Sequence, residues 1–102
     1  MKNILIIRSG GMGDALFITP AISMVRNNFP KAKISLLIPF PGPEVLRGNQ
    51  DVDQIIERPP GIGIKEKYFL SKLKSFNFDL LINLDPREAH NYRIWARAIN
   101  IN

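Results

Sequence analysis

The chain has 102 residues, 45% hydrophobic and 23% charged, which is the composition of one small globular domain. It contains no cysteine and one histidine, so disulfides, a cysteine nucleophile and a metal site built from several histidines are excluded. The net charge of +5 favours an anionic partner, but the basic residues are scattered and the aromatic-glycine pattern of an RNA-binding sheet is absent, so we expect no nucleic-acid partner.

Apolar runs predict four strands along the chain. Three of the runs are almost continuously apolar, which is typical of strands that are buried on both faces of a parallel sheet. The four predicted strands are Ile4–Ile7, Ile34–Ile38, Gln54–Ile56 and Asp79–Leu84.

Segments with helical character separate and follow these strands, at 14–28, 43–47, 64–75 and 89–99. In the first, the apolar face comprises Leu16, Ile18, Ile22, Val25 and Phe29. In the third, Tyr68, Leu70 and Leu73 can face a sheet while Lys65, Lys67, Lys72 and Lys74 stay in solvent. Alternating strands and helices predict an α/β fold, a Rossmann-like doubly wound parallel sheet, of which four strands form only a part.

Pro20 interrupts the first helical segment, because a proline inside a helix removes one hydrogen bond and clashes with the preceding turn. Either the helix is kinked there, or a short turn at 14–18 precedes a helix with Thr19 as N-cap and Pro20 as its first residue. We favour the second arrangement.

Three glycines, Gly10, Gly11 and Gly13, lie between the first strand and Asp14. A dinucleotide-binding fingerprint is a poor match, because Leu16 stands where the third glycine belongs and no acid ends the second predicted strand. A P-loop is also a poor match, because no Gly-Lys-Ser or Gly-Lys-Thr follows. Two interpretations stay open: a tight turn with Asp14 as an N-cap, or an active-site loop whose carboxylate is a general base.

The stretch "ILIIRSGGMGDALFITPAISMVRNNFPKAKISLLI", followed by "NQDVDQIIE" and "FNFDLLINLD", resembles the N-terminal half of glycosyltransferase family 9, the heptosyltransferases of lipopolysaccharide core synthesis. The resemblance spans nearly the whole chain. The matching positions are Arg8, Gly13, Asp14, Thr19, Pro20, Ala21, Phe29, Pro30 and Ala32.

The resemblance implies a GT-B enzyme with two Rossmann-like domains, of which residues 1–102 would be the N-terminal, acceptor-binding one. It implies metal-independent, inverting transfer without a cofactor, with a nucleotide sugar such as ADP-heptose as donor substrate. Asp14 would be the catalytic base, and Gly10, Gly11, Met12 and Gly13 would contact the acceptor. The donor domain would lie outside this chain, so we expect the chain to be inactive by itself.

A second candidate group follows the fourth predicted strand, where Arg87 and Arg93 lie beside the same strand ends as Asp14. An arginine fork suits a phosphate on the acceptor. The alternative, that these are solvated residues at a helix start, stays open.

The apolar run that ends at Arg8 is too short for the core of a signal peptide, and no run approaches the roughly 18 residues of a membrane span. We therefore expect a cytoplasmic protein, with an anionic lipopolysaccharide core as acceptor and a peripheral contact with the inner face of the membrane. The alternative function is a non-catalytic α/β module that binds a nucleotide or phosphorylated ligand.

Overall fold

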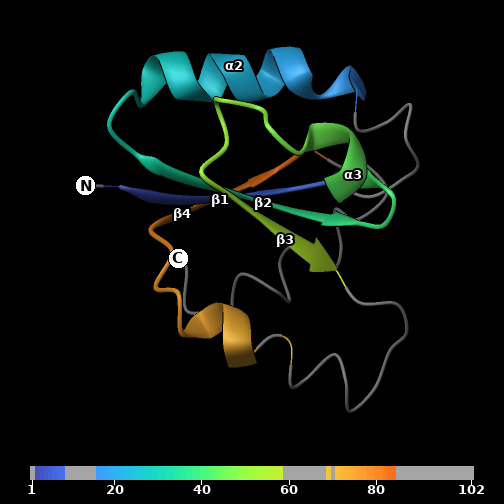
Figure 1. The fold of residues 1–102 in the computed structure, drawn as a ribbon. Coiled ribbons are helices and arrows are strands. Elements are labelled where there is room, and N and C mark those ends of the chain that lie inside the picture. Colours follow the sequence, from blue (N-terminus) through green and yellow to red (C-terminus); the bar gives the residue numbers. More distant parts are fainter. Residues whose placement is uncertain (1, 9–15, 59–68, 70, 85–102) are drawn as a thin grey trace.

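The computed structural model describes residues 2–8, 16–58, 69 and 71–84. Each predicted strand is present, with its ends shifted by at most two residues. The described elements are β1 (Asn3–Ile7), α2 (Thr19–Asn28), β2 (Lys33–Pro39), α3 (Gly42–Leu46), β3 (Gln54–Arg58) and β4 (Leu80–Asn83) (Figure 1).

The four strands form one sheet in the order β3-β2-β1-β4, and every pairing is parallel, as predicted. Strand β1 lies between β2 and β4, with Ile4 opposite Ile34 on one side and Leu80 on the other. The carboxyl ends of all four strands therefore meet at one edge of the sheet.

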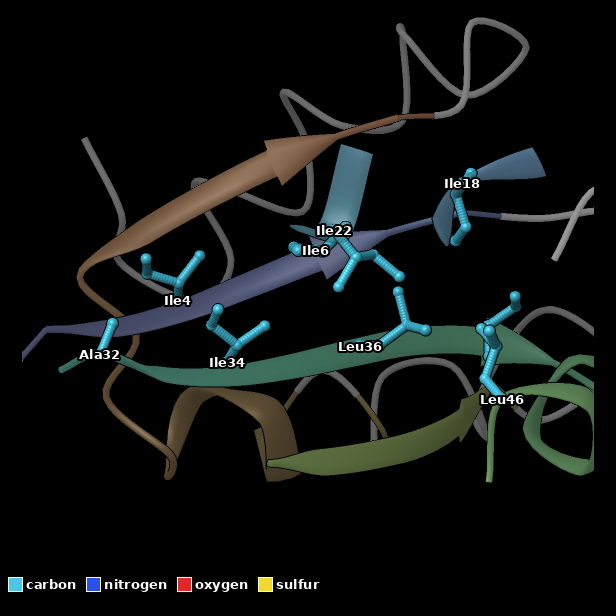
Figure 2. Close-up of a cluster of buried hydrophobic side chains, with 9 residues drawn as sticks. Ile4, Ile6, Ile18, Ile22, Ala32, Ile34, Leu36 and Leu46 are labelled. Carbon is cyan, nitrogen blue, oxygen red and sulfur yellow. The ribbon is translucent and has the colours of Figure 1, made fainter. Parts of the chain in front are cut away.

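Alternate residues of β1 and β2 enter two separate hydrophobic clusters, one on each face of the sheet. On the face covered by α2 and α3, Ile6 and Leu36 project toward Ile22 of α2 (Figure 2). On the other face, Leu5 and Leu37 pack with Phe69, Leu73 and other apolar residues. Helical segments thus cover both faces of the sheet, which confirms the doubly wound arrangement (Figure 1).

The third predicted helix is seen in part, at residues 69 and 71–74. Leu73 is fully buried and Lys72 and Lys74 are exposed, as predicted. Phe69, which the sequence pattern did not single out, is also buried. The remaining predicted residues of that helix, Tyr68, Leu70, Lys65 and Lys67, and the helix predicted at 89–99 lie outside the described residues.

Helix α2 begins one residue earlier than predicted. Its N-cap is Ile18, which makes no side-chain capping bond, so the assignment of Thr19 as N-cap was wrong. The hydroxyl of Thr19 instead donates to the carbonyl of Leu16 at 2.8 Å. Pro20 still falls in the first turn, where a missing N–H breaks no helical bond.

The short helix α3 is held tightly against the end of β2. A Cβ atom at Gly42 would lie 2.6 Å from the side chain of Ile38, so the close approach requires glycine at this position. The turn after α3 contains Gly48 with φ of +90°, a conformation that other residues rarely adopt.

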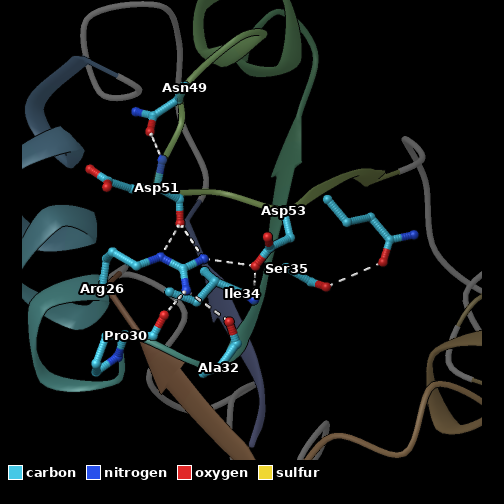
Figure 3. A network of polar contacts seen from close by, with 9 residues as sticks. Arg26, Pro30, Ala32, Ile34, Ser35, Asn49, Asp51 and Asp53 are labelled. Carbon is cyan, nitrogen blue, oxygen red and sulfur yellow. Dashed lines mark hydrogen bonds and ion pairs between the residues drawn. The ribbon is translucent and has the colours of Figure 1, made fainter. Parts of the chain in front are cut away.

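Arg26 of α2 ties the helix to the loops at the amino edge of the sheet (Figure 3). Its guanidinium donates to the carbonyl of Asp51 from Nε and Nη2, at 3.2 and 3.0 Å, and to the carbonyl of Ala32 from Nη1 at 2.8 Å. It also forms an ion pair with Asp53, at 2.7 Å. One side chain therefore fixes the position of α2 relative to the segments that begin β2 and β3.

Asp53 has a second role in the same network, because its Oδ2 accepts the backbone N–H of Ile34 at 2.8 Å. This hydrogen bond, followed by that from Arg26, holds the pKa of the Asp53 carboxyl below its ordinary value of 3.8. The ionised form is consequently the one that stabilises the fold.

We predict that Arg26→Met lowers the free energy of unfolding by about 2–3 kcal/mol, because the substitution keeps the stem but removes the charged hydrogen bonds. The matched control is Arg47→Met. Arg47 forms an ion pair with Glu44 alone among the described residues, and both side chains are more than half exposed, so its loss should cost less than about 0.5 kcal/mol. Urea unfolding measures both values, and equal losses would contradict the role given to Arg26.

We also predict that Asp53→Asn is more destabilising at pH 7 than at pH 3. A carboxyl whose pKa is lowered by folding contributes its stability above the ordinary pKa and loses it as the pH falls through the folded-state value. The effect should be modest and should weaken in salt, since the Asp53 side chain is 45% exposed. Urea unfolding of both proteins at the two pH values tests this, and an equal loss at both would refute it.

Candidate functional site

The strand order reverses direction at β1. From β1 the chain adds β2 and then β3 on one side, and β4 then pairs with the opposite side of β1. In open parallel sheets, ligands bind outside the carboxyl ends of the strands at such a reversal. The ends of β1 and β4, where Ile7 lies opposite Asn83, therefore mark the candidate site.

Arg8 follows β1 directly and hydrogen-bonds to the chain on both sides of it. Its backbone N–H donates to the carbonyl of Leu37 in β2 at 3.1 Å, and its Nη1 donates to the carbonyl of Leu84 after β4 at 2.5 Å. The N–H of Leu84 returns a bond to the carbonyl of Ile7 at 2.9 Å. The Nε atom of Arg8 is out of contact with solvent, so the guanidinium is held within the structure.

The predicted site residues follow these two strand ends along the chain. Gly10, Gly11, Met12, Gly13 and Asp14 come after Arg8, and all five lie outside the described residues. The second group, Arg87 and Arg93, comes after Leu84 and also lies outside them. The structure therefore brings together the strands from which both segments leave, and it does not place the predicted side chains themselves.

Three apolar side chains near this edge are exposed. Leu16 and Phe17, which precede α2, are 59% and 84% exposed, and Phe40, directly after β2, is 68% exposed. The sequence pattern placed Leu16 on the buried face of the first helix, and that assignment was wrong. Ile18, two residues later, is the first side chain of this segment that reaches the core (Figure 2).

A pocket of about 430 Å³ lies elsewhere, between α3, the following turn and β3. Its polar groups serve the fold: Asn49 accepts the N–H of Asp51, and Gln54 accepts the hydroxyl of Ser35. None of the predicted site residues lines it. The pocket residues are Pro43, Leu46, Arg47, Gly48, Asn49, Val52, Asp53, Gln54, Ile55 and Glu57.

Within the described ranges, no three histidine or acidic side chains come close enough together to hold a metal ion. None of the helices in that part of the chain is long and apolar enough to cross a membrane.

Comparison with known proteins finds a relative by sequence. No family model matches the chain. Lipopolysaccharide heptosyltransferase 3 of Escherichia coli is 36% identical over 78 residues, and the match covers 71% of this chain and 23% of the relative. Over this stretch, the chain is similar to part of a lipopolysaccharide heptosyltransferase.

Two solved structures share the fold of this chain. A family 9 glycosyl transferase from Veillonella parvula has a TM-score of 0.78 and 22% identity, with 98% of this chain and 30% of that one covered. The Escherichia coli ADP-heptose lipopolysaccharide heptosyltransferase II has a TM-score of 0.75 and 20% identity, with 99% and 29% covered. The chain thus spans less than a third of the length of these proteins.

Sequence reasoning included Arg8 in the family pattern but gave it no role. Its contact with Leu84 joins residues 76 positions apart, and no local spacing predicts such a bond. The sequence feature that could have pointed to Arg8 is a charged residue directly after a predicted buried strand, at the edge of the sheet where such folds place their sites.

Proposed function

We propose that this chain is the N-terminal, acceptor-binding domain of a GT-B glycosyltransferase that moves a heptose or related sugar onto a lipopolysaccharide core acceptor. The donor is a nucleotide sugar such as ADP-heptose, bound by a domain outside this chain. The reaction is inverting and uses no metal or other cofactor. The protein works in the cytoplasm, against the inner face of the membrane that carries its acceptor.

The observation that carries the proposal is the 36% identity with a lipopolysaccharide heptosyltransferase. The fold adds support, because β1 and β4 end side by side where the strand order reverses. The glycine segment leaves from one of these ends and the arginine-bearing segment from the other. Two segments remote in sequence thereby start from one place, as a shared binding site requires.

In the proposed reaction, a hydroxyl oxygen of the acceptor attacks the anomeric carbon of the donor and the bond from that carbon to the phosphate oxygen breaks. The hydroxyl proton passes to the carboxylate of Asp14, and ADP leaves with the electron pair of the broken bond. A general base must come within about 2.6–3.2 Å of the hydroxyl oxygen. The glycines before Asp14 carry no side chains and so allow an acceptor to approach the backbone closely.

The acceptor's chemistry suits the charge of the chain. A lipopolysaccharide core is anionic, and the chain carries a net charge of +5. Exposed Phe17 and Phe40 offer aromatic surface near the same edge, against which apolar faces of a substrate can pack.

We predict that Asp14→Asn lowers turnover by about 10²–10⁴-fold with donor binding nearly unchanged, because the amide keeps the shape of the side chain but cannot accept the proton. The measurement is heptosyl transfer by the full-length protein, together with its melting temperature.

The matched control is Asp79→Asn, which makes the same chemical change at an exposed carboxylate that accepts the N–H of Asn3, at the amino end of β1. Turnover of the folded control should stay close to that of the wild type. If Asp14 is only an N-cap, Asp14→Asn will instead cost on the order of 1 kcal/mol of stability and leave turnover nearly intact. That result would contradict the assignment of Asp14 as the catalytic base and leave it a structural residue.

We further predict that replacing Arg87 or Arg93 by Ala weakens acceptor binding by about 1.5–3 kcal/mol, the range for a hydrogen bond to a charged group. Calorimetry with acceptor and donor separately measures the change. Lys33→Ala is the control, because it removes an exposed positive charge at the start of β2, at the opposite edge of the sheet. Loss of donor binding with acceptor binding intact would assign the arginines to the other substrate.

A further inference from the structure

Arg8 holds both neighbours of β1 at the carboxyl edge of the sheet. The backbone N–H bonds to Leu37 in β2, and the guanidinium bonds to the carbonyl of Leu84, the residue after β4. At the same edge, the N–H of Leu84 donates to the carbonyl of Ile7.

We propose that Arg8 is a positioning residue for sugar transfer, because it holds the end of β1 against Leu84, and the chain continues from these two points into the segment after β1 and the segment after β4. The inference rests on the proposed function, in which the first segment carries the base and the second carries the acceptor-binding arginines. Arg8 itself is not a catalytic residue in this proposal, because it acts through the main chain of Leu84.

The chemistry of the contact favours this role over general stabilisation. A charged hydrogen bond to the carbonyl of Leu84 restrains the main chain directly after β4, because that oxygen belongs to a planar peptide group. Arg8 also lies just before the glycine segment, separated from it by Ser9 alone. The hydrogen bond from Arg8 to Leu84 therefore links the two points from which the segments continue. Errors of about 1 Å in the placement of reacting groups can lower the rate of an enzyme roughly 100-fold.

Arg26 provides the internal comparison. It also makes several hydrogen bonds to main-chain carbonyls, but it does so between α2 and the loops at the amino edge of the sheet, opposite the edge that holds Arg8 and Leu84 (Figure 3). A purely structural arginine should change stability alone. A positioning arginine should change the rate of the folded enzyme as well.

The experiment compares Arg8→Met, Arg8→Lys and Arg26→Met in the full-length protein, with turnover and both Michaelis constants measured on the folded fraction. For Arg8→Met we expect kcat/KM for the acceptor to fall by about 10–100-fold while the donor KM changes less than about twofold. Arg8→Lys keeps the charge and one donor, so we expect an intermediate loss. Arg26→Met should lower the melting temperature without changing these constants.

Amide hydrogen exchange at Leu84 supplies a readout that does not depend on activity. The N–H of Leu84 should exchange faster in Arg8→Met than in the wild type, and Arg26→Met should leave it unchanged. If Arg8→Met transfers sugar at the wild-type rate, the proposal is overturned, whether or not the Leu84 N–H exchanges faster. Faster exchange in that case would make Arg8 a purely structural residue. A wild-type protein that transfers no sugar would instead contradict the proposed function.

Discussion

Strand β1 is buried on both faces and hydrogen-bonded along both edges, and the placement of the other described elements depends on it. Its residues Ile4 to Ile7 are at most 4% exposed, so no change of register is possible without exposing one face of the sheet. The two-sided burial requires a layer of helix above and below. The parallel pairing on both edges brings the ends of β2 and β4 to the end of β1.

Two arginines stabilise this sheet at opposite edges through hydrogen bonds to main-chain carbonyls. Arg26 at the amino edge and Arg8 at the carboxyl edge both donate to main-chain carbonyls of segments remote in sequence. Arginine suits the task because its planar head carries five donors, stays charged at every relevant pH and can serve several carbonyls at once. The two arginines differ in the segments that they hold, which are structural loops at the amino edge and the start of the candidate site at the carboxyl edge.

The proposed function gives this geometry a chemical meaning. The proposed lipopolysaccharide acceptor is large and anionic, and a site for it must gather groups from more than one segment. A parallel sheet suits this task, since all its strands end at one edge and ligands of such sheets bind where the strand order reverses, as it does at β1. In the proposed enzyme, the described part of the chain would supply the edge of this site, with the exposed side chains of Phe17 and Phe40 close to it.

The amino-acid sequence by itself determined the class of fold and the positions of the four described strands along the chain. An almost continuously apolar strand such as Ile34–Ile38 is stable only when both faces of the sheet are covered. The run that shows this is contiguous in the sequence, so it can be recognised without the structure. The sequence also indicated where a site should lie, through glycines and an acid after the first strand, although the roles of Asp14, Arg87 and Arg93 stay predictions.

Tertiary structure decided what depends on contacts between distant residues. The exposure of Leu16 and the burial of Phe69 follow from where each helix meets the sheet, which helical periodicity alone cannot specify. Thr19 is not the N-cap, because α2 begins at Thr19 itself and Ile18 occupies the capping position, and the Thr19 hydroxyl donates to the carbonyl of Leu16. The hydrogen bond from Arg8 to Leu84 joins residues 76 positions apart. It forms because β4 pairs with β1, and this pairing exists only in the assembled sheet.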